Sequence, residues 1–220
     1  MPSRRSLPLL FALVSALLAG CASTDLEGSD RGVLMPTVRA VFDLSEGGEG
    51  DQDSGPMRFD HGFELAATGA SDSMVLDGVV GGPGDVSYQA LHGSALYRVG
   101  FDGRRAAVHG LVGVGVDRVE LTDNPLVRGE EGYAGPMVGV EAELRVRDWF
   151  APYLRLTTQV MDQGAFSQQF EIGARFPTCS AADVLVAWRS WDAEYEDLAR
   201  TGQDLEVDWR GFVLGFGLRF

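Results

Sequence analysis

Two residues in the segment LHGSA, His92 and Ser94, have the types and the spacing for nucleophilic chemistry. Residues two apart in a strand share one face, so the imidazole could accept the proton of the hydroxyl. The nearest acidic candidate on the next predicted strand, Glu120, lies at its far end. The other histidines are His61 and His109. Parity predicts His92 and His109 inside the fold and His61 outside, and we expect no enzymatic activity.

The elements that must position these residues are strands, because apolar side chains recur at every second position along most of the chain. Residues 132–147 show this most clearly, with Val138, Val140 and Leu144 on one face and Glu141 and Glu143 on the other. No segment after the N-terminal one approaches the roughly 18 apolar residues of a membrane-spanning helix. Strand-like runs cover residues 34–44, 57–68, 73–80, 86–101, 106–121, 132–147, 150–161, 166–177, 183–192 and 212–220.

The links between these runs differ in length and charge. The short links are 101–105, 147–150 and 177–183, and the longer acidic links are 45–56, 122–132 and 192–204. Short turns at one end and long loops at the other are typical of outer-membrane barrels. The sequence therefore predicts an all-β fold, a closed antiparallel transmembrane β-barrel of about ten strands. Residues 73–80 supply the tenth strand, eight strands are the alternative, and the acidic loops are extracellular and the short turns periplasmic.

Charged residues lie on the less apolar face of nearly every run. In water this pattern would bury many charges and expose a large apolar surface. In a bilayer it places apolar side chains against lipid and charges in the lumen. Because both signs are present, a salt-bridged plug is favoured over a selective pore. The predicted lumen network comprises Arg39, Asp43, Arg58, Asp60, Glu64, Arg98, Glu141, Glu143, Arg145, Arg155, Glu171 and Arg175, with Arg147, Arg189 and Arg219 on the same faces.

The N-terminal segment resembles a bacterial lipoprotein signal peptide. Arg4 and Arg5 precede an apolar run, and Leu-Ala-Gly-Cys follows, as in the lipobox whose cysteine, here Cys21, is acylated. The resemblance implies lipoprotein processing and sorting machinery as partners; ordinary cleavage after Ala22 is the alternative. The expected organisation is a signal peptide at 1–20, a tether at 21–32 and a barrel at 33–220.

The C-terminus resembles the signature that presents outer-membrane barrels to the barrel assembly machinery. Its alternating residues are Phe212, Leu214, Phe216, Leu218 and Phe220. With the signal peptide, this makes residues 33–220 similar to the small barrel class typified by OmpA, OmpX and OmpW. The resemblance implies an outer-membrane location and contact with membrane lipid and lipopolysaccharide.

Resemblances to outer-membrane enzymes are partial. An H-x-S pair occurs in lipid A deacylases, whose motif continues with Asn where this chain has Ala95. Omptin-type proteases use carboxylate and histidine pairs at the barrel rim, where this chain carries acids without a nearby histidine, and we expect solvated loops instead. The predicted rim acids are Asp192, Glu194, Glu196 and Asp197. The predicted girdle residues near strand ends are Trp149, Trp188, Trp191 and Trp209.

Composition narrows the function further. The chain has a formal net charge of −14 and no lysine, which makes nucleic acid an implausible partner. With Cys21 and Cys179 as the only cysteines, we expect no disulfide framework, no metal site and no cofactor. The expected role is a non-enzymatic envelope protein with a structural, adhesive or ligand-binding function. The alternatives are a narrow pore or carrier for small hydrophobic compounds, a lipid A-modifying enzyme, and a lipid-tethered periplasmic lipocalin-like barrel with the two strand faces exchanged.

Overall fold

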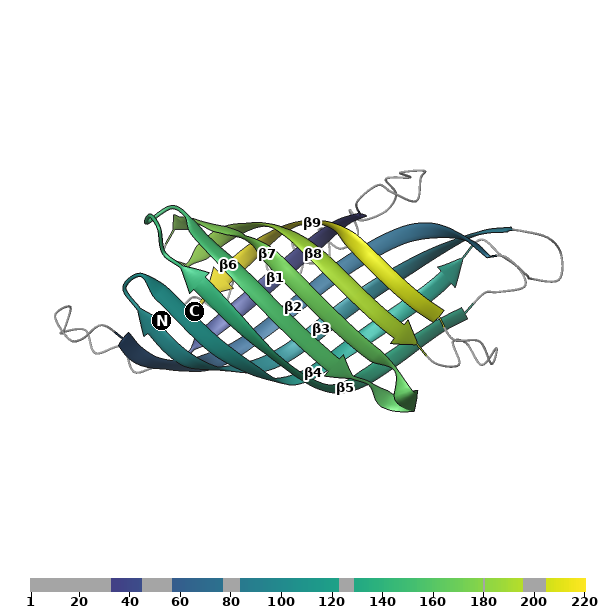
Figure 1. The fold of residues 1–220 in the computed structure, drawn as a ribbon, viewed down its shortest axis with the longest axis horizontal. Helices are drawn as coiled ribbons and strands as arrows, with labels where there is room; N and C mark the ends of the chain where they lie inside the picture. The colour runs from purple at the N-terminus through teal and green to yellow at the C-terminus, as the bar shows by residue number, and fades with distance from the viewer. Residues whose placement is uncertain (1–32, 45–56, 77–83, 123–128, 180, 196–204) are drawn as a thin grey trace, which may run out of the picture.

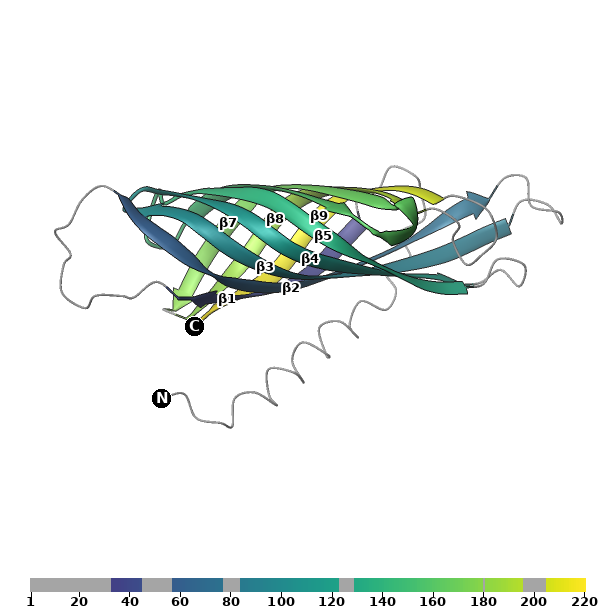
Figure 2. The same ribbon diagram turned by 90° about the horizontal axis from the view of Figure 1, so that it is seen from below.

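The computed structural model describes residues 33–44, 57–76, 84–122, 129–179, 181–195 and 205–220. These residues form one closed barrel of nine strands. The tilt of the strands is seen from two directions in Figure 1 and Figure 2. The predicted signal peptide, the tether and Cys21 lie outside the described residues. Within the described ranges, no helix is long and apolar enough to cross a membrane. The strands are β1 (Val33–Asp43), β2 (Met57–Leu76), β3 (Gly84–Gly103), β4 (Ala106–Thr122), β5 (Gly129–Leu144), β6 (Ala151–Val160), β7 (Phe166–Cys179), β8 (Ala182–Tyr195) and β9 (Leu205–Arg219).

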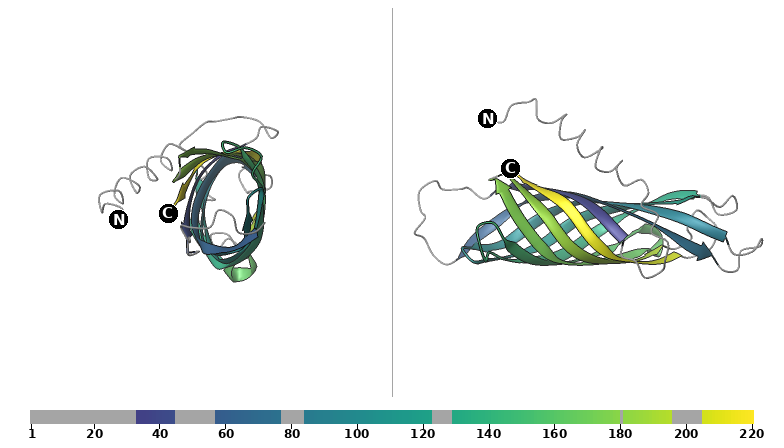
Figure 3. Two further views of the ribbon diagram at one scale, coloured as in Figure 1. Left: turned by 90° about the vertical axis from the view of Figure 1, so that its left-hand side faces the viewer. Right: turned by 90° about the horizontal axis from the view of Figure 1, so that it is seen from above.

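The barrel closes through a parallel pair. Each strand from β1 to β9 pairs antiparallel with the next one along the chain, and β1 then pairs parallel with β9, from Val33 opposite Gly211 to Val41 opposite Arg219. Seen along its axis, the sheet is a closed ring (Figure 3). The prediction of a closed all-β barrel is confirmed. The predictions of ten or eight strands and of wholly antiparallel pairing are wrong.

The missing strand is explained by the length of β2. The sequence predicted separate strands at 57–68 and 73–80, and residues 77–80 lie outside the described residues. Instead, β2 continues to Leu76 and pairs with β3 along its whole length. Ala70 faces the interior opposite Ala90, and both side chains are buried, so small residues here permit close packing inside one continuous strand. Because the barrel has nine strands and not ten, β1 runs in the direction opposite to the one that the sequence predicted.

That reversal decides which links share an end. We call the end with links 103–106 and 144–151 and the C-terminal Phe220 the turn end, and the opposite end, where β4 and β8 finish, the loop end. The N–H of Asp43 donates to the carbonyl of Phe220 at 3.1 Å, so β1 finishes at the turn end. The acidic link 45–56 therefore joins strands at the turn end, opposite to the end that the sequence predicted. At the loop end, a single 3-10 turn, η1 (Asp162–Gly164), connects β6 to β7.

The two faces of the sheet have opposite character. Large apolar side chains point outward from every strand, as with Val138, Phe212 and Val112, which are 54%, 64% and 51% exposed. Charged side chains point inward, as with Glu141 and Glu171, which are 1% and 2% exposed. The predicted alternation is therefore observed, with the polar face inside and the apolar face outside.

Glycines on the inner face of β9 allow β1 to close the ring. A Cβ atom at Gly211 would lie 1.7 Å from the carbonyl oxygen of Val33, and one at Gly215 would lie 2.3 Å from that of Thr37. No side chain fits at either distance. The alternating glycines near the C-terminus are thus required where the first and last strands meet (Figure 3).

The half of the interior toward the loop end is apolar and aromatic. Trp191 and Trp209 are fully buried there, with ring centroids 4.6 Å apart, and Tyr133 and Tyr195 pack together beside them. The prediction that Trp191 and Trp209 belong to an outward-facing girdle is wrong. The reason is that β9 begins at Leu205, so Trp209 shares the inner face of Gly211 and Val213. Trp149 and Trp188 do lie on the exterior.

Candidate functional site

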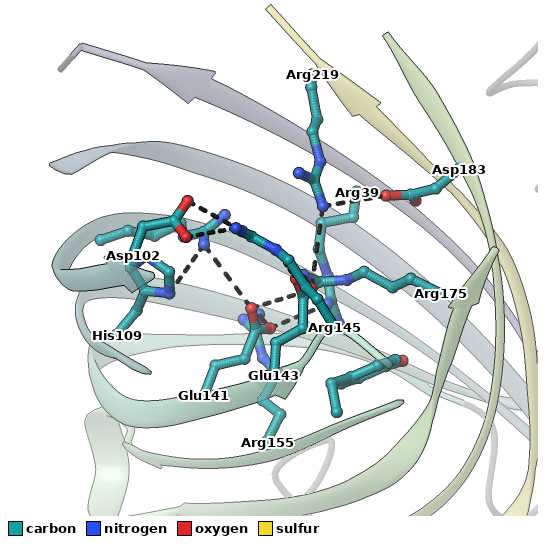
Figure 4. A network of polar contacts seen from close by, with 12 residues as sticks. Arg39, Asp102, His109, Glu141, Glu143, Arg145, Arg155, Arg175, Asp183 and Arg219 are labelled. Atoms are coloured by element: carbon teal, nitrogen blue, oxygen red, sulfur yellow. Dashed lines mark hydrogen bonds and ion pairs between the residues drawn. The ribbon is translucent and has the colours of Figure 1, made fainter. Parts of the chain in front are cut away.

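A network of arginines and glutamates fills the middle of the lumen. Glu141, on β5, accepts hydrogen bonds from Arg175 at 2.7 Å and from Arg39 and Arg155 at 3.2 Å each. These donors come from β7, β1 and β6, so the carboxylate of Glu141 contacts side chains from strands on different sides of the barrel (Figure 4). Arg98, on β3, lies 3.8 Å from the same carboxylate.

A second carboxylate, Glu171 on β7, organises the neighbouring part of the network. It accepts hydrogen bonds from Arg39 at 3.1 Å, from the Nε of Arg189 at 2.7 Å, and from the hydroxyl of Tyr153. Arg189 also donates to the hydroxyl of Thr68 at 2.8 Å. Arg39 therefore joins the two carboxylate centres, and the contacts cross the lumen from β1 to β7 and β8.

Burial makes full pairing a requirement at this level of the barrel. Arg39 and Arg155 are 3% and 6% exposed, and Glu64, which lies 2.7 Å from Arg155, is completely buried. An isolated charge removed from water is strongly unfavourable, so each of these groups depends on its partners. The contacts span the lumen with buried side chains.

Between the network and the turn end of the barrel, the lumen contains a cavity. Arg145 donates two hydrogen bonds to Asp102, at 2.6 and 2.9 Å, and a third to Glu143 at 3.2 Å. Arg219 lies 3.6 Å from Asp183 and remains 41% exposed. Beside these side chains is a cavity of about 500 Å³. Glu143, Arg145 and Arg175 form its inner wall, and the turns at 103–106 and 144–151 form its rim.

The predicted lumen residues divide into three groups by position. Those inside the network are Arg39, Glu64, Arg98, Glu141, Glu143, Arg155, Glu171, Arg175 and Arg189. Arg145 and Arg219 are half-exposed at the cavity, while Asp60 pairs with the buried His109 at 2.9 Å. Asp43, Arg58 and Arg147 are exposed at the turn end. The sequence did not identify Asp102, Asp183 or Tyr153 as partners of these residues.

His92 has an acidic partner that the sequence reasoning missed. Its Nδ1–H donates to Asp117 on β4 at 2.5 Å, and the hydroxyl of Tyr195 donates to the other carboxylate oxygen at 3.4 Å. Trp191 packs edge-on against the imidazole. His92 and Asp117 are 3% and 0% exposed. Asp117 was detectable, because it lies as far beyond the Arg104–Arg105 turn as His92 lies before it, which sets them opposite one another in an antiparallel pair.

The imidazole of His92 is buried, and its hydrogen-bond partner is Asp117. Ser94 shares the inward face of β3, yet among the described residues it forms no hydrogen bond with His92. The ring of Trp191 packs against the imidazole inside the barrel. His61 lies on the outer face, where its Nδ1 is 3.0 Å from the hydroxyl of Tyr97 within an aromatic cluster.

The two described rim acids, Asp192 and Glu194, point outward at the loop end, beyond the apolar part of the surface. Asp192 lies opposite Asp208 on β9, whose carboxylate pairs with Arg210 at 2.6 Å. Partial burial, together with the neighbouring carboxylate of Asp208, raises the pKa of Asp192 above its ordinary value. Glu194 is exposed on the same strand, while Glu196 and Asp197 lie outside the described residues.

Among the described residues, no group of three or more His, Cys, Asp or Glu side chains is arranged to hold a metal ion. Cys179 is a free, exposed thiol near the turn end of β7. Comparisons of the chain with family models, with curated proteins and with solved structures gave no match.

Proposed function

We propose that the protein is an integral β-barrel of the bacterial outer membrane with an occluded lumen. In this proposal it serves a non-enzymatic envelope role, structural, adhesive or ligand-binding, and the turn end faces the periplasm. The lipobox-like sequence at Cys21 and the C-terminal aromatic alternation support export and barrel assembly.

One observation carries the proposal: the apolar face of the sheet is outside and the ionic face is inside. Side chains such as Phe63, Val114 and Leu214 are 50%, 54% and 53% exposed. Burying one such side chain stabilises a protein by about 1.5–3 kcal/mol, so leaving a whole ring of them in water would be very unfavourable. Lipid removes that cost, and the closed sheet satisfies the backbone hydrogen bonds that lipid cannot.

Charges on the outer face support the same placement. On β4 the outward residues from Val108 to Val116 are apolar or glycine, and Arg118, which pairs with Glu130 at 2.6 Å, follows toward the loop end. On β9 the apolar series from Phe212 to Phe220 is preceded by Asp208 and Arg210. The apolar outer surface is thus bounded by charged residues at the loop end, as expected for a barrel that projects beyond the bilayer there.

The network supports an occluded lumen over a diffusion pore. A pore that conducts ions needs water along its length, whereas the contacts among Arg39, Glu141 and Glu171 fill the cross-section with buried side chains. A lipocalin-like barrel would instead need a polar exterior along its length, whereas the exterior here carries large apolar side chains on every strand.

The test is the electrophoretic mobility of the outer-membrane fraction, unboiled and boiled in SDS. A closed membrane barrel that resists SDS until heated is expected to run faster before boiling than after it. Reconstituted into a planar bilayer, the same protein is expected to show no steady ion conductance. Release from membranes as a soluble β-protein in mild detergent, with no mobility shift, would overturn the membrane proposal, and a steady conductance would overturn the occluded lumen.

A further inference from the structure

The cavity at the turn end has a charge opposite to that of the protein as a whole. Six arginines line it: Arg104, Arg105, Arg145, Arg147, Arg175 and Arg219. The acidic residues in its lining are Glu143 and Asp148. In a chain with a formal net charge of −14, this concentration of guanidinium groups around one cavity creates a local positive field.

The arginines divide into those already paired and those left to act on a ligand. Arg145 and Arg175, at the inner wall, form short ion pairs with Asp102 and Glu141. Within the described residues, Arg104, Arg105 and Arg147 at the rim have no ion-pair partner. Their side chains are exposed at the two turns that border the opening. These three guanidinium groups retain the hydrogen-bond donors that an incoming anion would need.

The inner wall gives the cavity a definite depth. Glu143 and Arg175 belong to the buried network, so the cavity ends on packed side chains and does not continue through the lumen. Arg219 extends into it from β9 with more than a third of its side chain exposed, held by two longer contacts, at 3.6 Å to Asp183 and 4.0 Å to Glu143 (Figure 4). A ligand entering from the turn end thus meets an arginine rim, then Arg219, and then a closed floor.

We propose that this cavity, the arginine vestibule, binds a phosphate group presented by a small phosphorylated molecule or by a lipid headgroup. Arginine suits this ligand because its planar guanidinium group donates two parallel hydrogen bonds to phosphate oxygens. Lysine is absent from the chain, so every positive side chain here has that geometry. The volume of about 500 Å³ accommodates a phosphate together with part of the molecule that carries it.

The first arm of the test measures pyrophosphate binding to the full chain in non-ionic detergent by isothermal titration calorimetry. The test variant replaces Arg105 and Arg147 with glutamine, since both side chains are exposed in turns and the barrel should fold without them. The control replaces Arg118 and Arg210 with glutamine; these lie at the loop end and are 58% and 66% exposed. The two variants change the net charge equally, so a difference between them reports the vestibule.

The second arm measures retention of lipid by native mass spectrometry, from micelles that contain phosphatidic acid or phosphatidylcholine. Saturable pyrophosphate binding that is weakened about tenfold or more in the test variant, and less than about twofold in the control, supports a soluble phosphorylated ligand. Retention of phosphatidic acid over phosphatidylcholine, lost in the test variant alone, supports a lipid headgroup. Absence of both, or equal binding in the two variants, overturns the proposal.

Discussion

Arg39 on β1 and Glu171 on β7 meet across the lumen, with Nη2 and Oε1 3.1 Å apart although 132 positions separate the residues in the chain. Both side chains are buried, and Arg39 also contacts Glu141 on β5 at 3.2 Å. Contacts of this length between different sides of the barrel require a lumen narrow enough for these side chains to meet. The network therefore acts as an internal cross-brace between strands that share no backbone hydrogen bonds.

Removing the central arginine should expose this role. Arg39→Ala leaves Glu64, Glu141 and Glu171 buried with one cation fewer, and loss of one partner from a buried pair costs about 3–5 kcal/mol. We expect the temperature at which the unboiled form converts to the boiled mobility to fall clearly. Arg58→Ala, which removes an exposed arginine of the same barrel, is the control and should leave that temperature nearly unchanged. Equal stability of Arg39→Ala and the wild type would contradict the bracing role.

The pair formed by His92 and Asp117 should matter for stability and have no effect on lipid chemistry. His92→Ala leaves the carboxylate of Asp117 buried without its closest donor, which costs about 1–3 kcal/mol or more for a charged group. We expect a less heat-stable barrel and an unchanged mass spectrum of lipid A from cells that carry the variant. A stable His92→Ala barrel together with altered lipid A would instead assign the pair to catalysis.

Closure of the barrel should depend on the glycines opposite β1. Gly211→Val places a branched side chain where a single Cβ would already lie 1.7 Å from the carbonyl oxygen of Val33. We expect this variant to fail to reach the fast-migrating folded form, since the strands cannot separate without losing the parallel pairing. Gly93→Ala is the matched control, because a Cβ there has its nearest contact at 4.0 Å. Normal folding of Gly211→Val would show that β1 and β9 do not pair in this register.

A charge in the middle of the outer face should oppose membrane insertion. Val112 faces outward from the middle of β4, opposite Val138 on β5. An arginine on the lipid-facing side near the bilayer midplane costs about 2–4 kcal/mol. We expect Val112→Arg to lower the folded fraction in liposomes, whereas Gln168→Arg, on the exposed outer face near the loop end, should leave it unchanged. Equal folding of the two variants would argue against lipid contact at Val112.

The faces of the strands could be predicted from the sequence because side-chain parity is a local property. Glu141 and Val138 are three positions apart in one strand, so alternation alone predicted them on opposite faces, and the structure agrees. The register of β3 and β4 was equally accessible, because the tight turn at Arg104 and Arg105 fixes which residues pair. Counting outward from that turn would have identified Asp117 as the partner of His92.

The closure of the barrel could not be predicted in the same way. Gly69 and Ser71 indicate a turn by type, and only pairing with β3 shows that the chain stays extended there. Once β2 is one strand, β1 must run parallel to β9. This pairing joins residues from opposite ends of the chain, and no local sequence pattern predicts it. The arginine vestibule followed from that closure, because Arg105, Arg147 and Arg219 come from separate turns and strands that meet only in the finished ring.

The most direct test of the central claim is the environment of Val138, which is 54% exposed on the outer face of β5. A nitroxide label is attached at Val138→Cys in a chain with Cys21 and Cys179 replaced by serine, and at Glu130→Cys as the water-exposed reference. After reconstitution in phosphatidylcholine vesicles, we predict that the label at position 138 collides readily with oxygen and is shielded from a polar nickel complex. The label at position 130 should show the reverse. Equal access of the nickel complex to both positions would contradict a membrane-spanning barrel.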